Sequence, residues 1–335
     1  MNSAKPDQPL PVGITMGDAA GIGPEIIVKL AASELPHPAV IYGDVAVLNK
    51  AAASCGLSDK IHIVPLAHAA DALELPENTL GVVNRWEPFT AVPPPGQIDT
   101  RAGRAAYEYL CHAIDDALAG KLHAIVTAPL NKEAMHKAGI EQPGHTEILA
   151  QRSKAPHVAM VMVNNELRVT LATIHIPLAE VPTALSIDGQ LTTIRLAHQA
   201  CLQAGVSKPR IAVAGLNPHA GENGQFGTEE QTIIAPAIDI AQQEGIKVSG
   251  PWPGDTVFMQ ARQGKFDMVV AQYHDQGLIP VKYLGLDDGV NMTAGLPFVR
   301  TSVDHGTAFD IAGQGIADEH SLRTAFELAV QMTNP

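Results

Sequence analysis

Three histidines stand directly after apolar runs of the sequence. His175 follows VTLATI, His219 follows IAVAGLNP, and His274 follows MVVAQY. In open α/β sheets, ligands bind at the carboxyl ends of the strands, so the three positions can share one cleft. Three imidazole nitrogens that leave one coordination position open are typical of a catalytic site for a divalent metal such as zinc. We therefore expect these histidines to converge on one metal ion.

A structural role is the alternative for each histidine, because an imidazole at a strand end commonly hydrogen-bonds to nearby backbone groups. More than forty residues separate successive candidates, so no helix fixes their geometry as it does in an HExxH motif. Their equivalent places after predicted strands favour the metal interpretation.

A second group of residues suits an anion. GHTE at 144–147 places His145 and Thr146 at a predicted helix start, where backbone N–H groups favour phosphate. An ordinary helix cap without a ligand is the alternative. Lys282 and Arg300 add positive charge and Asn291 adds a neutral donor, although each alone also fits a surface residue.

A third group lies in TSVDHGTAFDIAG, residues 301–313. Gly306 allows close backbone approach of a dinucleotide, His305 can stack or hydrogen-bond, and Asp304 and Asp310 can accept from ribose hydroxyls. A tight turn leading into a helix is the alternative. No GxGxxG follows the first predicted strand, so a Rossmann cofactor site near the start of the chain is not supported.

The elements that must position these residues alternate along the chain. Short apolar runs separated by stretches of helical period indicate an α/β protein with largely parallel sheets covered on both faces. Strands are predicted in VGITM, AVIYG, IHIVP, LGVVN, HAIVTAP, VAMVMV, LRVTLATI, RIAVAGLNP, KVSGPW and FDMVVAQYH. Helices are predicted over 24–33, 100–119, 131–138, 189–204, 228–244 and 319–332. The residues from Tyr273 to Gly277 are expected to form a turn, and the Pro-rich stretch 86–98 is either a domain boundary or an ordered surface loop.

Size, charge and composition exclude several classes of protein. A chain of 335 residues with 46% hydrophobic and 17% charged residues is typical of about two folded domains or one large α/β unit. The net charge of -13 and scattered Lys and Arg leave no basic stripe for nucleic acid. Neither a signal-peptide core nor a membrane span is recognisable, so we expect a cytoplasmic protein with no membrane partner. The three widely spaced cysteines indicate neither a disulfide framework nor a zinc-thiolate site.

Six blocks of the sequence together resemble the 4-hydroxythreonine-4-phosphate dehydrogenase family, which includes D-threonate and D-erythronate 4-phosphate dehydrogenases. The blocks are MGDAAGIGPEI, APLNKEAMHKAGI, GHTE, GLNPHAGENGQFGTEE, YHDQGLIPVKYLG and GVNMTAGLPFVRTSVDHGTAFDIAG. The ending HGTAFDIAG is also similar to the cofactor loop of isopropylmalate and isocitrate dehydrogenases, which bind NAD without a Rossmann fingerprint.

The resemblance implies two α/β domains with a cleft between them, as in isopropylmalate and isocitrate dehydrogenases. It further implies a homodimer in which the partner chain completes each active site. We expect residues 1–130 and 300–335 to form one domain with the NAD loop. Residues 131–299 would form the other, with the metal and substrate residues and the dimer interface.

The resemblance also implies a role for each candidate residue. A divalent ion, zinc, magnesium or cobalt, would be bound by His175, His219 and His274. The substrate would be bound by His145, Thr146, Lys282, Asn291 and Arg300. NAD or NADP would be bound by Asp304, His305, Gly306 and Asp310. The candidates for the proton acceptor are Asp275, Asp255 and Lys282, with Asp275 expected instead to orient His274.

The implied reaction oxidises the secondary alcohol of 4-phosphooxy-L-threonine with NAD and then releases carbon dioxide, giving 3-amino-2-oxopropyl phosphate for pyridoxal phosphate biosynthesis. Oxidation of D-threonate or D-erythronate 4-phosphate stays open, because these acids differ from the amino acid at one substituent on C2. The branch of the family that oxidises aromatic dihydrodiols is disfavoured, because GHTE is of the phosphate type. A non-catalytic protein that binds a phosphorylated metabolite is the remote alternative, although binding alone would not require an open metal site.

Overall fold

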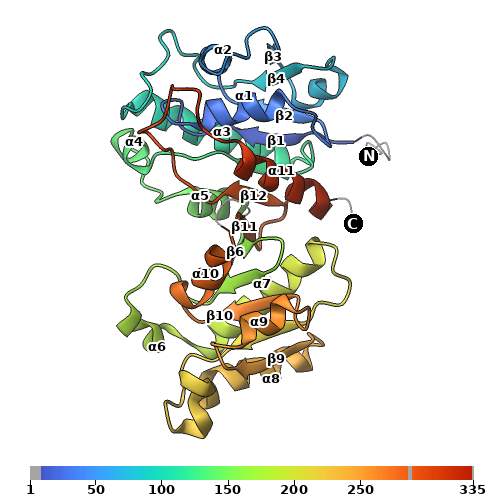
Figure 1. Ribbon diagram of the computed structural model, residues 1–335, viewed down its shortest axis with the longest axis vertical. Helices are drawn as coiled ribbons and strands as arrows, with labels where there is room; N and C mark the ends of the chain where they lie inside the picture. The colour runs from blue at the N-terminus through green and yellow to red at the C-terminus, as the bar shows by residue number, and fades with distance from the viewer. Residues whose placement is uncertain (1–8, 286–288, 334–335) are drawn as a thin grey trace. The chain divides into compact units, whose positions relative to one another are not determined.

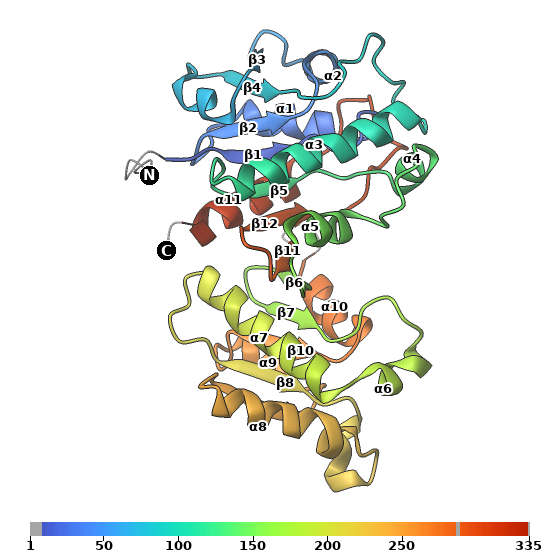
Figure 2. The same ribbon diagram turned by 180° about the vertical axis from the view of Figure 1, so that it is seen from behind.

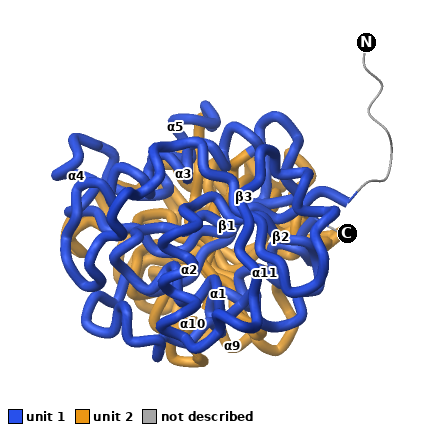
Figure 3. The backbone as a smooth tube through the Cα atoms, turned by 90° about the horizontal axis from the view of Figure 1, so that it is seen from above, with its two compact units in different colours: residues 1–155, 297–333 blue, residues 156–296, 334–335 orange. Residues whose placement is uncertain are grey.

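The computed structural model describes residues 9–285 and 289–333, which form two compact units. Unit 1 comprises Met1–Ala155 and Pro297–Thr333, and unit 2 comprises Pro156–Leu296, as coloured in Figure 3. We expected the first boundary after residue 130, whereas residues 131–155 belong to unit 1. The start of the chain, where we expect no signal peptide, lies outside the described residues.

The difference at the boundary has a packing reason. In unit 1 the long helix α3 (Thr100–Leu118) contacts both α4 (Lys132–Lys137) and α5 (His145–Ser153). These contacts hold the chain after residue 130 against unit 1 until α5 has ended.

Unit 1 is built on a parallel sheet in the order β3-β4-β2-β1-β5-β12. Arg300, the first residue of β12, is in register with Ile125 of β5. The strands are β1 (Val12–Thr15), β2 (Ala39–Tyr42), β3 (His62–Leu66), β4 (Thr79–Val83), β5 (Ile125–Thr127) and β12 (Arg300–Val303).

Helices cover both faces of this sheet, as expected for parallel strands. Figure 1 shows α1 and α11 in front of the sheet, and Figure 2 shows α3 in front of the opposite face. The remaining helical segments of unit 1, in addition to α3, α4 and α5, are α1 (Gly23–Ala31), α2 (Val45–Ser54), the 3-10 turn η1 (Ala69–Glu74) and α11 (His320–Thr333).

Unit 2 contains a mixed sheet in the order β11-β6-β7-β10-β8-β9. Strand β6 is antiparallel to both of its neighbours, and the run β7-β10-β8-β9 is parallel. The strands are β6 (Ala159–Val163), β7 (Arg168–Leu171), β8 (Ile211–Ala214), β9 (Val248–Trp252), β10 (Met268–Ala271) and β11 (Val290–Ala294).

Helices α7 and α8 lie over one face of this sheet in Figure 2, and α9 and α10 lie over the other in Figure 1. The helical segments are η2 (Leu178–Glu180), α6 (Val181–Ala184), α7 (Ile187–Gln203), η3 (Pro218–Gly224), the π-helical turn η4 (Glu230–Ile234), α8 (Ala235–Gln243), α9 (Val257–Arg262) and α10 (His274–Tyr283). The apolar core that α9 and α10 form with the sheet includes Val169, Leu171, Ala212, Phe258, Val269, Leu278 and Val281.

The α/β class and every strand predicted from the apolar runs are confirmed. Each predicted helix is present within two residues of its expected ends. The helix predicted over 228–244 consists of η4 and α8 together. Strands β11 and β12 were not predicted. The turn expected after Tyr273 is wrong, because α10 begins at His274. The Pro-rich stretch 86–98 is an irregular segment within unit 1 and not a domain boundary. Within the described ranges, no helix has both the length and the apolar content to cross a membrane.

Asp116 ties α3 to the sheet of unit 1. Its buried carboxylate accepts from the Tyr42 hydroxyl at 2.7 Å, pairs with Arg85 Nη2 at 2.7 Å, and accepts from Lys121 Nζ at 3.1 Å. Burial by itself raises the pKa of Asp116, but the hydrogen bonds from Arg85, Tyr42 and Lys121 outweigh it and hold the pKa below its ordinary value. The ionised form therefore stabilises the fold.

We expect Asp116→Asn to lower the free energy of unfolding by about 2 to 3 kcal/mol at neutral pH, the range for lost hydrogen bonds to a buried charge. Because the folded-state pKa is depressed, this contribution is present above the ordinary aspartate pKa of 3.8 and is lost as the pH falls through the folded-state pKa. Urea unfolding followed by circular dichroism measures the free energy of unfolding at each pH.

Asp115→Asn is the matched control, because Asp115 is exposed and pairs with Arg152 at the surface, so its loss should cost at most about 1 kcal/mol. Equal losses in the two variants would contradict the role of Asp116.

Candidate functional site

The parallel strands β7, β10 and β8 end at one edge of the unit 2 sheet. His175 follows β7, His219 follows β8, and His274 follows β10 after only two residues. Helix α10 packs closely on the sheet at Gly277, where a Cβ atom would lie 2.4 Å from Leu171 Cδ2. This close approach places His274, at the first turn of α10, at the edge where the other strands end.

His175 and His274 are neighbours at this edge. Their ring centroids are 5.8 Å apart with an interplanar angle of 42°. His274 Nδ1 lies 2.7 Å from Asp275 Oδ1, and since an ionised carboxylate can only accept, the ring donates through Nδ1, which in the neutral form of the ring leaves a lone pair on Nε2. The two histidines and Asp275 line a pocket of about 250 Å³. Two imidazoles held in this way suit the binding of one divalent ion.

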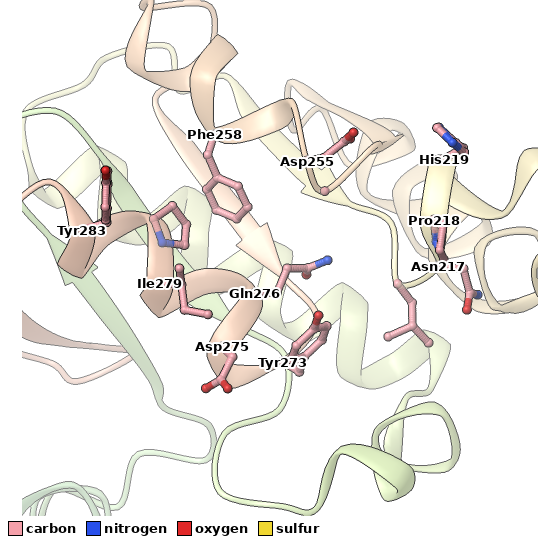
Figure 4. A pocket seen from close by; sticks show the side chains of 13 residues that line it. Asn217, Pro218, His219, Asp255, Phe258, Tyr273, Asp275, Gln276, Ile279 and Tyr283 are labelled. Atoms are coloured by element: carbon pink, nitrogen blue, oxygen red, sulfur yellow. The ribbon is translucent and has the colours of Figure 1, made fainter.

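His219 lies in a second pocket of about 680 Å³, which it shares with Asp255, Tyr273 and Asp275. Figure 4 shows His219 and Asp255 on one side of this pocket and Asp275 on the other. Among residues 9–285 and 289–333 of one chain, no group of three His, Cys, Asp or Glu side chains is arranged to hold a metal. A single chain thus brings together His175 and His274, and the expected convergence of all three histidines is not seen within it.

A cationic group lies at the carboxyl end of β5 in unit 1. The buried Arg300 donates from Nη2 to Thr127 Oγ1 at 2.6 Å, and the His145 imidazole is hydrogen-bonded to the backbone of Ala128. Burial, together with the charges of Arg300 and Lys132, holds the pKa of His145 well below its ordinary value, so the ring is neutral at neutral pH. The helix start predicted in GHTE is confirmed, because α5 begins at His145 with Gly144 as its N-cap.

The predicted cofactor segment is an irregular loop in unit 1. The Ile22 amide donates to the carbonyl oxygen of Thr307 at 3.0 Å, and the Gly313 amide donates to the Glu25 carboxylate. These contacts fasten the loop to the first turn of α1 and to the residues before it. His305 is exposed. The loop does not lead directly into a helix, because α11 begins only at residue 320.

Comparison with known proteins identifies the family. Residues 34–329 match the family described as "Pyridoxal phosphate biosynthetic protein PdxA". The chain belongs to the PdxA family. It is 51% identical over 329 residues to the 4-hydroxythreonine-4-phosphate dehydrogenase of Beijerinckia indica, covering 97% of this chain and 96% of that protein. It is 47% identical over 326 residues to the D-threonate 4-phosphate dehydrogenase of Salmonella typhimurium, covering 96% and 98%.

A solved structure agrees with this assignment. The crystal structure of the 4-hydroxythreonine-4-phosphate dehydrogenase from Klebsiella pneumoniae matches with a TM-score of 0.88 and 43% identity, covering 97% of this chain and 100% of that one. The family resemblance is confirmed, and the chain is a dehydrogenase of the PdxA family. A dehydrogenase of this family implies NAD or NADP as the cofactor.

The predicted substrate residues of this PdxA-family chain are divided between its units. His145, Thr146 and Arg300 lie in unit 1. Unit 2 contains Lys282, in the last turn of α10, and Asn291, on β11. These two lie in the same unit as the histidine pair, but neither lines the two pockets described above.

Two glutamines that the sequence reasoning missed link the ends of β7, β8 and β10. Gln276 accepts from the Gln272 amide at 2.7 Å and donates to the carbonyl oxygen of Gly215 at 2.8 Å. The Gln272 side chain donates to the carbonyl oxygen of Ala214 at 2.8 Å, and its own backbone carbonyl accepts from Thr173 Oγ1 at 2.7 Å. This network holds the three strand ends in register. The two glutamines that flank YHD in the sequence were the available signal.

Glu230, which the sequence reasoning also missed, holds the turn that carries His219. Its buried carboxylate accepts from the amides of Leu216 at 2.8 Å and Asn217 at 2.7 Å, and from Asn217 Nδ2 at 3.0 Å. Residues 219–223 then run through left-handed backbone with φ between 42° and 82°. Four of these residues are not glycine, so the turn is strained and needs such anchoring. Gly221 fits beside Glu230, where a Cβ would lie 2.7 Å from Oε2.

We expect Glu230→Ala to speed hydrogen exchange at the Leu216 and Asn217 amides by about 10- to 100-fold, because both lose a charged acceptor. Amide exchange followed by mass spectrometry or NMR measures this. Glu229→Ala is the control, since Glu229 accepts from the Asn217 side chain at 2.8 Å whereas the Leu216 and Asn217 amides donate to Glu230, so both amides should stay protected. Unchanged exchange in Glu230→Ala would show that the turn is held by other contacts.

Proposed function

We propose that this PdxA-family dehydrogenase oxidises the secondary alcohol of 4-phosphooxy-L-threonine with NAD. The resulting β-keto acid loses carbon dioxide to give 3-amino-2-oxopropyl phosphate, a step of pyridoxal phosphate biosynthesis. The observation that carries the proposal is the His175–His274 pair, with Asp275 bonded to His274, at the carboxyl edge of β7 and β10. The 51% identity to a relative named for this substrate supports it.

The proposal assigns His175, His219 and His274 as ligands of one zinc, magnesium or cobalt ion. The ring separation of His175 and His274 and the lone pair left on His274 Nε2 fit such an ion. Because only two of the three rings meet within one chain, the proposal includes a homodimer in which a second copy completes the site. A divalent ion there would lower the pKa of the substrate hydroxyl and polarise the carbonyl oxygen of the ketone.

Asp275, through its hydrogen bond to Nδ1, orients His274 toward the ion. With this carboxylate engaged, Asp255 and Lys282 are the proposed acceptors of the hydroxyl proton.

The remaining candidate residues are assigned to binding of the substrate or of the cofactor. His145, Thr146 and Arg300 in unit 1, with Lys282 and Asn291 in unit 2, are proposed to bind the substrate. The loop with Asp304, His305, Gly306 and Asp310 is proposed to bind NAD or NADP. The nicotinamide of that cofactor would accept the hydride.

Oxidation of D-threonate 4-phosphate is the second candidate function, with D-erythronate 4-phosphate as its close variant. The observation in its favour is the 47% identity to the Salmonella typhimurium enzyme over 96% of this chain.

The substituent on C2 distinguishes the two candidates, because the amino acid carries an ammonium group there and the sugar acids carry a hydroxyl. The exposed carboxylates Asp255 and Asp275, which line one pocket, favour a cationic substituent.

The deciding experiment follows NADH absorbance with the three phosphorylated substrates, with and without a chelator, and repeats the series with NADP. We expect the highest kcat/KM with 4-phosphooxy-L-threonine, loss of turnover with the chelator, and recovery on adding divalent metal. A higher kcat/KM with a sugar-acid phosphate would replace the first candidate with the second. Absence of reduction with every substrate would favour a non-catalytic binding protein.

We expect His274→Ala to lose bound metal and turnover together, and Asp275→Asn to weaken metal binding by about 10- to 100-fold. Metal content after dialysis and steady-state rates measure the two effects. His157→Ala is the matched control, because His157 is exposed and lies outside both pockets. Full metal content with full activity in His274→Ala would refute the assignment of this histidine.

A further inference from the structure

Lys132 lies beside the cationic group of unit 1, although neither the motifs nor the family resemblance assigned it a role. It is exposed in the first turn of α4, one residue after the N-cap Asn131. Its Cε atom lies 3.5 Å from the position that a Cβ on Gly144 would occupy. Since Gly144 directly precedes His145, the Lys132 side chain extends over the start of α5.

The ammonium group of Lys132 is not engaged by a neighbouring carboxylate. Glu147 Oε2 also lies 3.5 Å from the Cβ position of Gly144. No ion pair within the described part of the chain includes Lys132, however, whereas Lys137 on the same helix pairs with Glu133 at 2.8 Å. Lys132 and Glu147 thus flank Gly144 without forming an ion pair.

Positive charge converges on His145 from two elements. The guanidinium of Arg300 is fixed by its bond to Thr127 Oγ1, and Lys132 approaches from α4. Both charges disfavour protonation of His145, and its pKa is lowered by burial and by these two cations. Cations held close together repel one another, and an anion that binds between them relieves this repulsion.

We propose that Lys132 binds the phosphate group of the substrate together with Arg300 and His145. This inference rests on the proposed function, in which every candidate substrate carries a phosphate ester. A phosphate monoester carries about -1.5 to -2 charges at neutral pH, more than one guanidinium neutralises. Arg300 is buried and fixed, so it supplies a forked donor of set direction, while Lys132 supplies a mobile point charge from the solvent side.

The consequence is a specificity for phosphorylated over unphosphorylated substrate. Lys132 contacts a group remote from the reacting carbon, so it binds the ground state and the transition state equally. Loss of such an interaction raises KM and leaves kcat unchanged. A residue with a merely structural role in α4 would instead lower kcat and stability for any substrate.

The test compares Lys132→Gln with the matched control Lys137→Gln, each assayed with the phosphorylated substrate that wild type prefers and with its dephosphorylated form. We expect Lys132→Gln to raise KM for the phosphorylated substrate by about 10- to 100-fold with kcat unchanged. The kcat/KM for the dephosphorylated form should not change, and Lys132→Arg should recover most of the loss. Lys137→Gln should behave as wild type. An unchanged KM in Lys132→Gln, or an equal loss with both substrate forms, would overturn the assignment.

A titration with inorganic phosphate separates this inference from the proposed function. Phosphate bound in this group should raise the pKa of His145, followed by NMR and assigned with His145→Gln. Lys132→Gln should need about 10- to 100-fold more phosphate for the same response. If wild type oxidises none of the substrates, the proposed function fails and the titration still decides the role of Lys132. Equal phosphate affinity in wild type and Lys132→Gln, or no response of His145 in wild type, would overturn the inference.

Discussion

The parallel pairing of β7, β10 and β8 is the constraint on which the candidate metal site depends. Because these strands run in the same direction, the residues that follow them must lie at one edge of the sheet, whatever their distance along the chain. The backbone hydrogen bonds of the strands set this geometry, and the amides of Gln272 and Gln276 maintain it beyond the last residue of each strand. A site built in this way needs no compact sequence motif.

The same constraint explains which parts of the fold the sequence could predict. Apolar strands between helices are recognisable because a parallel sheet buries both of its faces. Strand β12 was not predicted because it contains no apolar run. Its buried residues include Arg300, Thr301 and Ser302, which form hydrogen bonds instead of contributing apolar surface. Helix α10 was not predicted because it contains Gly277 and Pro280, and both residue types are typical of turns.

The candidate site was predictable only where a residue follows a parallel strand directly. Position after a strand correctly indicated that His175 and His274 lie at one edge. It could not indicate where His219 lies, since the direction of that side chain depends on a left-handed turn anchored by Glu230, which comes eleven residues later. The sequence could not indicate a role for Lys132 either. Its position beside Gly144 results from the packing of both α4 and α5 on α3 and not from a local sequence pattern.

The distribution of charge differs between the two units. The chain as a whole carries a net charge of -13, which opposes the binding of an anion. Unit 1 nevertheless gathers Arg300 and Lys132 around a neutral His145, whereas the unit 2 pockets contain imidazoles beside the carboxylates Asp255 and Asp275. The first environment suits a phosphate ester, and the second suits a hydroxyl that must lose a proton. Local placement of a few charges, more than the overall charge of the protein, therefore sets the chemistry of each unit.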